Sequence, residues 1–220
     1  MHTSSTTARL AALALTLATL AAPAAAAITS YQGRFDGDDD RFVIDFDLAA
    51  ATRLSATTWS YAGGTNAAGD AVAAGGFVPV LALFEATEGL LRIVRGSTHT
   101  CAQGGSADPA TGFCWDAMFD GLFAAGHYRL VLTQDGNEPL GTFFDDGFAQ
   151  DGVPDYTGQL FAGQPGLHFV QVDGAQRDAH WALDISIGSV PEPASPALLV
   201  LAGAAWALAR RTARSTRPSA

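Results

Sequence analysis

The chain has 220 residues, of which 48% are hydrophobic and 15% are charged, and its formal net charge is −10. All 12 basic residues are arginine, which excludes chemistry that needs a lysine Schiff base or a lysine phosphate clamp. Several of these arginines lie in the terminal segments, so the middle of the chain is strongly acidic. An acidic surface repels nucleic acid and anionic lipid. We therefore expect no nucleic-acid partner, and a cation such as calcium is the natural charged partner.

The first residues have the order of a secretory signal peptide. Arg9 supplies a positive charge, residues 10–20 form an alanine and leucine run, and residues 21–27 offer several small-x-small cleavage sites. We assign residues 1–26 to a signal peptide, with cleavage expected between Ala24 and Ile28. The chain is then expected to use the general secretion machinery and signal peptidase, leaving roughly 160 residues outside the two terminal signals, the size of one domain.

The last part, residues 188–220, combines a short motif, an apolar run and a basic end. The motif is Val190-Pro191-Glu192-Pro193, the run covers residues 194–209, and Arg210-Arg211 follows. The prolines favour extended backbone, which separates a preceding strand from a following helix. At about 1.5 Å per residue the run would reach roughly 24 Å, short of a bilayer core of about 30 Å. We expect a marginal transmembrane helix with the arginines on the cytoplasmic side and the domain outside.

This tripartite end resembles the PEP-CTERM sorting signal of Gram-negative bacteria. The match falls on Pro191, Glu192, Pro193, the 194–209 run and Arg210-Arg211. The resemblance implies that a membrane-embedded exosortase cuts near the motif. The protein would be anchored transiently in the inner membrane and then reach the cell surface or the exopolysaccharide matrix.

Between the terminal signals, apolar and polar residues alternate with a period of two, which is typical of half-buried strands. The alternation is regular in residues 41–48, 127–133 and 180–187. Residues 80–84 are continuously apolar and predict a central strand, and less regular patterns predict strands in 54–61, 90–94 and 167–172. Loops rich in glycine and aspartate separate these segments, and no middle segment has a helical stripe. We expect an all-β fold, an antiparallel β-sandwich with jelly-roll-like connections, over residues 28–187.

The middle is also similar to the small β-sandwich ectodomains that accompany PEP-CTERM tails, and more distantly to bacterial pre-peptidase C-terminal domains. The residues that carry this similarity are 33–35, 40, 42–48, 75–84 and 125–130. Such domains usually carry aspartate where this chain has Val78. The resemblance implies an accessory, non-catalytic module and names no ligand.

Cys101 and Cys114 are the only cysteines. Export to an oxidising compartment favours a disulfide between them. A thiol nucleophile or a metal-binding pair is the alternative, but neither cysteine has the nearby CxxC partner that such sites favour.

Two acidic segments are candidate calcium loops. Asp36, Asp38 and Asp40 have the spacing of the first three EF-hand ligands, but Arg41 stands where that motif needs glycine and a strand follows. An irregular calcium loop and a solvated acidic turn both remain open for this segment.

The second acidic segment covers residues 145–155 and offers Asp145, Asp151 and Asp155 as ligands. Its latter half is similar to an extracellular calcium repeat, but Gly147 and Ala149 stand where the first carboxylates should be. A calcium loop and an ordinary polar loop are again the alternatives.

No sequence signature predicts catalysis, because HExxH, GxSxG and phosphate-loop motifs are absent from the sequence. His127 and His180 fall on the outward phase of strands, although a carboxylate pair for glycoside cleavage stays open. Trp59, Tyr61 and Trp115 could form a sugar-stacking surface or fill the core. We expect a non-enzymatic surface or matrix protein with a structural or adhesive role. A calcium-dependent carbohydrate-binding module and a secreted hydrolase are the alternatives.

Overall fold

The computed structural model describes residues 26–96, 101 and 105–188, and Ala27–Gly188 form one compact unit. The predicted signal peptide up to residue 25 and the predicted sorting motif lie outside the described residues. Within the described part of the chain, no helix has the length and apolar character needed to cross a membrane. The predicted membrane helix at 194–209 also lies outside that part.

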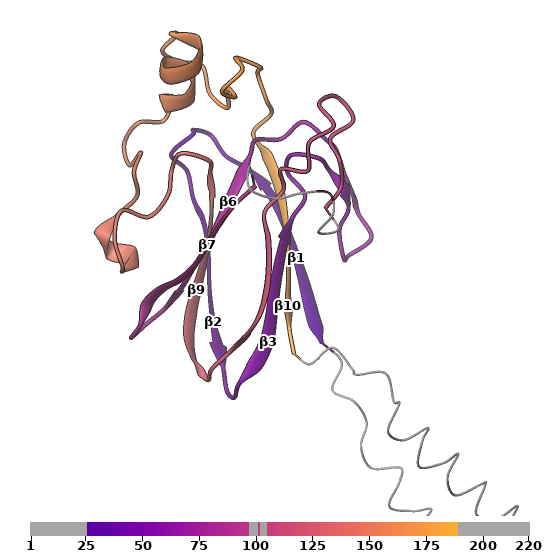
Figure 1. Ribbon diagram of the computed structural model, residues 1–220, viewed down its shortest axis with the longest axis vertical. Helices are drawn as coiled ribbons and strands as arrows, with labels where there is room; N and C mark the ends of the chain where they lie inside the picture. The colour runs from indigo at the N-terminus through magenta and orange to yellow at the C-terminus, as the bar shows by residue number, and fades with distance from the viewer. Residues whose placement is uncertain (1–25, 97–100, 102–104, 189–220) are drawn as a thin grey trace, which may run out of the picture. The chain divides into compact units, whose positions relative to one another are not determined.

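Two four-stranded antiparallel sheets form the domain (Figure 1). The first sheet contains, in spatial order, β1 (Ala27–Arg34), β10 (His180–Ile187), β3 (Thr52–Thr58) and β8 (Met118–Phe123). The second contains β2 (Phe42–Leu48), β9 (Gly126–Gln134), β6 (Pro79–Glu85) and β7 (Gly89–Arg95). A small ribbon of β4 (Gly64–Thr65) and β5 (Ala71–Val72) completes the strands of the described residues. The predicted all-β, antiparallel class is confirmed.

The main core lies between the two sheets, because its buried residues come from both. Leu54 and Leu183 of the first sheet belong to the same cluster as Leu81 and Leu130 of the second. The predicted alternation is confirmed in β9, where Tyr128 and the two leucines that follow at alternate positions are buried in this cluster. Burial of such side chains at about 25 cal/mol per Å² of apolar surface is the main force that holds the sheets together.

The outer faces of the sheets are less exposed than the alternation predicts. Asp184 of β10 is buried, and its Oδ2 accepts hydrogen bonds from Trp59 Nε1 and from the backbone N–H of Ala67 in the loop between β4 and β5, each at 2.8 Å. On the second sheet, Val131 is buried in a separate apolar cluster with Phe148. Loops therefore cover part of both outer faces, which a strand pattern alone does not reveal.

The predicted strand at 167–172 is wrong. The segment contains only an isolated bridge between Val170 and Gln176, and Phe169 has a φ of 56°. The backbone N–H of Phe169 donates to Asp38 Oδ1 at 2.6 Å instead of joining a sheet. The carboxylate of Asp38, distant in sequence, thus accepts the backbone hydrogen bond that Phe169 would otherwise donate to a neighbouring strand.

The disulfide between Cys101 and Cys114 is confirmed, with Cα atoms 5.2 Å apart. It closes a loop with a sequence separation of 13 residues. Replacing both cysteines by serine should lower the free energy of unfolding by about 3 kcal/mol, because the unfolded chain gains the entropy of an open loop. Urea unfolding of the two proteins measures this difference, and a loss below about 1 kcal/mol would show that the loop is held by other contacts.

Candidate binding site

The structure brings the two acidic segments together. The backbone N–H of Asp38 donates to the carbonyl of Pro154 at 2.7 Å, and Gly152 N–H donates to Asp39 Oδ2 at 3.0 Å. Arg41 forms an ion pair with Asp151 at 2.9 Å. The turn between β1 and β2 is thus joined to the long connection between β9 and β10, residues 135–179.

Asp38 is the central link between these segments, and its side chain is fully buried. Its Oδ2 accepts hydrogen bonds from Thr157 N at 2.8 Å and Thr157 Oγ1 at 2.5 Å, while its Oδ1 accepts from Phe169 N. Burial raises the pKa of Asp38, and the hydrogen bonds from Thr157 and Phe169 act in the opposite direction. The carboxyl group serves as an internal acceptor that fixes two positions of the 135–179 connection.

Other predicted calcium ligands also bind their own loops. Asp40 Oδ2 accepts from the backbone N–H of Asp36 at 2.6 Å, and Asp151 Oδ2 accepts from Phe148 N at 3.0 Å. The hydrogen bond from the backbone N–H of Gly166 lowers the pKa of Asp155. Within the described residues, no group of three or more histidine, cysteine, aspartate or glutamate side chains is placed to hold a metal ion. Calcium binding stays a prediction from the sequence.

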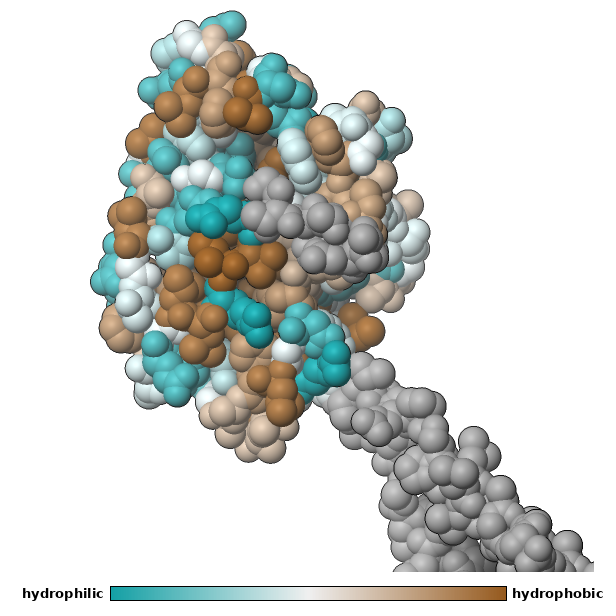
Figure 2. Space-filling model, in the orientation of Figure 1, coloured by the Kyte–Doolittle hydropathy of each residue, from teal (hydrophilic) through white to brown (hydrophobic). Residues whose placement is uncertain are grey.

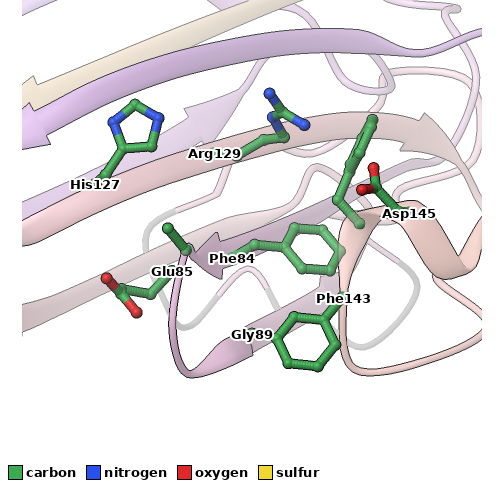
Figure 3. Close-up of a pocket in the computed structure, with 9 residues that line it drawn as sticks. Phe84, Glu85, Gly89, His127, Arg129, Phe143 and Asp145 are labelled. Atoms are coloured by element: carbon green, nitrogen blue, oxygen red, sulfur yellow. The ribbon is translucent and has the colours of Figure 1, made fainter.

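Asp145, another predicted ligand, lines a hollow on the outer side of the second sheet (Figure 3). The hollow has a volume of about 200 Å³ and lies between the β6–β7 hairpin, β9 and the short 3₁₀ turn η3 (Phe144–Asp146). Figure 3 shows Phe84 in its middle, with Phe143 and Asp145 on one side and His127 and Arg129 of β9 on the other. We call it the outer-face hollow.

The two β9 side chains that line the outer-face hollow, His127 and Arg129, are already paired. Arg129 Nε donates to Asp45 Oδ1 at 2.7 Å, and the guanidinium lies 4.4 Å from the ring centre of Phe144. His127 Nδ1 lies 2.8 Å from Asp47 Oδ1 on the neighbouring strand. The residues that line the hollow offer neither a hydroxyl nor a thiol nucleophile, and Phe143 is exposed. This arrangement provides a contact surface with an apolar centre.

A second hollow, the end cleft, lies where β9 ends and β6 begins. Its volume is about 90 Å³. It is lined by Phe77, Val78, Trp115, Gln134, Asp135, Phe161, Phe169, Val170, Gln171, Val172 and Arg177. At this end of the first sheet, Arg34 of β1 lies opposite His180 of β10 in the strand register. At the other end, Ala27 lies opposite Ile187. The chain thus enters and leaves the sandwich at the end away from the cleft.

Exposed apolar side chains are concentrated in the 135–179 connection, which contributes many of the residues that line the end cleft. Six large hydrophobic residues of residues 135–179 are exposed: Leu140, Phe143, Val153, Leu160, Phe161 and Val172. Figure 2 shows hydrophobic residues among polar ones on the upper loops, where Figure 1 draws η4 (Gly158–Ala162) as an orange coil. Exposed apolar side chains on a long, ordered connection are typical of an interaction surface.

The aromatic residues predicted from the sequence do not form one exposed platform. Tyr61 is fully buried beneath the guanidinium of Arg177, 4.0 Å from its ring centre, and Trp59 is half-buried against Asp184. Trp115 borders the end cleft and stacks on Phe113 with ring centres 4.4 Å apart. Sequence reasoning missed the glutamines and Phe161 of the cleft, because they carry no local signature and only the fold brings them together.

No protein-family model matches this chain, and no curated protein sequence matches it. Its function must therefore be inferred from its own residues.

Proposed function

We propose that this chain is a non-enzymatic, exported protein of the cell surface or extracellular matrix, delivered by a PEP-CTERM sorting signal and adhesive in function. The order of Val190-Pro191-Glu192-Pro193, the 194–209 run and Arg210-Arg211 supports the sorting step. The disulfide is compatible with an extracellular location. The partners are then signal peptidase, an exosortase and a component of the matrix.

We further propose a jelly-roll connection for the sandwich. The order β1-β10-β3-β8 in one sheet and β2-β9-β6-β7 in the other supports it, because successive long strands alternate between the two sheets everywhere except at the β6–β7 hairpin, in the manner of paired Greek keys. Such a fold has its loops grouped at two ends, and the 135–179 connection enlarges one of them.

The observation that carries the adhesive role is the construction of the 135–179 connection. Buried Asp38 fixes its backbone at two positions, while Leu160 and Val172 project exposed apolar side chains from it. A loop that is both ordered and apolar at its surface can bind a partner without a large entropic cost. Adhesion also suits a domain whose chain enters and leaves at the opposite end.

The two alternatives have less support. The carboxylates of Asp38, Asp40, Asp151 and Asp155 already accept hydrogen bonds from the protein, so calcium would have to displace those donors. Hydrolysis would need a positioned pair of groups, and the histidines that the structure describes already contact other groups. His180 Nε2, for example, lies 2.8 Å from the carbonyl of Ala73.

Sorting is tested by replacing Pro191, Glu192 and Pro193 with alanine in an exosortase-bearing bacterium. The variant should remain in the membrane fraction, because the processing enzyme loses its extended recognition segment, whereas the unchanged protein should reach the surface or the medium. Pro218→Ala changes a proline of the same tail outside the motif and serves as the control. Equal release of the motif variant and the unchanged protein would contradict the sorting proposal.

A further inference from the structure

We propose that the end cleft binds a neutral saccharide ring without the help of calcium. This inference gives the proposed adhesive function a ligand class and rests on that function for its biological setting. The binding itself follows from the residues that line the cleft.

The strongest sign of a ligand is a pair of buried glutamines that line the cleft. Gln134 is 5% exposed and Gln171 is 6% exposed. The side-chain Oε1 of Gln134 and both amide atoms of Gln171 have no hydrogen-bond partner among the described residues. Leaving a buried amide atom unpaired costs about 1–3 kcal/mol, so three such atoms in one cleft are a substantial burden on folding. Ordered water or a polar ligand would pair with them, and their place at a cleft that opens to the surface favours a ligand.

The unpaired atoms specify the chemistry of that ligand. They comprise two acceptors and one donor. Sugar hydroxyls meet both needs, because each hydroxyl donates and accepts hydrogen bonds. Glutamine amides bear no charge, so they favour a neutral partner and need no metal ion as an intermediary.

The walls of the cleft suit the apolar faces of a sugar ring. Trp115 supplies a partly buried aromatic face, Phe161 and Val172 provide exposed apolar groups, and the almost fully buried rings of Phe169 and Phe77 back the cleft from the core. Trp115 is held by its stack on Phe113, and Phe169 by its backbone hydrogen bond to Asp38. A cleft with aromatic walls and a few convergent polar groups has the lining of a small-ligand site, and at about 90 Å³ it would contact one face of a sugar ring and leave the rest in solvent.

The charges around the cleft disfavour anionic ligands. Arg177 is neutralised by Asp108, with Nη2 and Oδ2 2.6 Å apart, and its Nε donates to the carbonyl of Gly76. Burial raises the pKa of Asp135, and the nearby Glu138 raises it further. An anion would meet these acidic groups, and the one arginine in the cleft lining is already paired. A neutral ring is therefore the best fit to the lining as a whole.

The test compares the full chain, purified in detergent, with Gln134→Leu and Gln171→Leu variants on immobilised dextran, galactomannan, xyloglucan and alginate, each with chelator and with calcium. We expect the unchanged protein to bind at least one neutral polysaccharide in chelator. Each leucine variant should bind about tenfold more weakly or worse, since an amide partner is lost. The same variants should melt at the original temperature or above it, because they remove an unpaired buried amide.

Gln150→Leu is the matched control. Gln150 lies in the same connection, but its Nε2 donates to the carbonyl of Gly136, so this variant should lose stability and keep binding. Binding to alginate alone, binding that needs calcium, no retention on any neutral polysaccharide, or full binding by the leucine variants would each overturn the proposal. The assay uses purified protein, so a failure here leaves the sorting test of the proposed function unaffected.

Discussion

Replacing Arg177 by methionine should lower the free energy of unfolding by about 3–5 kcal/mol. Arg177 and Asp108 form an ion pair in which the side chains are only 8% and 1% exposed. Methionine would fill part of the space but leave a buried carboxylate without its cation. The stacking on Tyr61 and the hydrogen bonds to the carbonyls of Gly76 and Tyr61 would be lost as well. Urea unfolding monitored by tryptophan fluorescence measures the loss.

Arg34→Met is the control for this prediction, because Arg34 pairs with Asp178 where both side chains are well exposed. An exposed pair contributes about 0–1 kcal/mol, so the control should stay close to the unchanged protein. If Arg177→Met does not fold, the double variant with Asp108→Leu should recover part of the stability, since it removes the unpaired charge. Equal small losses for Arg177→Met and Arg34→Met would contradict the buried-pair interpretation.

Replacing Asp38 by alanine should lower the free energy of unfolding by about 3 kcal/mol or more. Three donors, two on Thr157 and one on Phe169, would remain buried without their acceptor, and each unpaired group costs about 1–3 kcal/mol. The link between the β1–β2 turn and the 135–179 connection would weaken at the same time. Hydrogen exchange should therefore show faster exchange at Thr157 and Phe169.

Asp36→Ala is a closely matched control for Asp38→Ala. Asp36 lies two positions earlier in the same acidic cluster, but its side chain is exposed. A surface substitution of this kind usually changes stability by less than about 0.5 kcal/mol. Similar losses for the two variants would mean that the cluster acts as a group of charges and that Asp38 has no special bracing role.

The strands were predictable where the burial of their faces sets a clear pattern of apolar residues. Residues 41–48 alternate because β2 has a core face and an open face, and residues 80–84 are continuously apolar because β6 is covered on both sides. β1 was missed because polar and apolar residues do not alternate regularly in residues 27–34, and this segment joins the sheet through backbone pairing with β10. Local patterns cannot report a strand that is stabilised mainly by its neighbour.

The candidate site was less predictable than the fold. The acidic segments were found by composition, but their partners were not, because Asp38 and Phe169 are 131 positions apart in the sequence. The same limit applies to the end cleft, where Trp115, Gln134 and Gln171 come from three separate segments. A buried glutamine also looks like any polar loop residue until its surroundings are known. Long-range contacts thus decide which polar residues stabilise the fold and which are available to bind a ligand.

The claim that the 135–179 connection is the adhesive surface is tested most directly by matrix retention in an exosortase-bearing bacterium. The double variant Leu160→Ser with Val172→Ser removes two exposed apolar side chains from that connection. Leu122→Ser is the control, because it removes an apolar side chain from β8 that is 75% exposed, close to the 73% of Val172. We predict that the double variant is washed from the matrix at least about tenfold more readily, while Leu122→Ser is retained like the unchanged protein. Equal retention of all three proteins, or equal loss of both variants, would contradict the account.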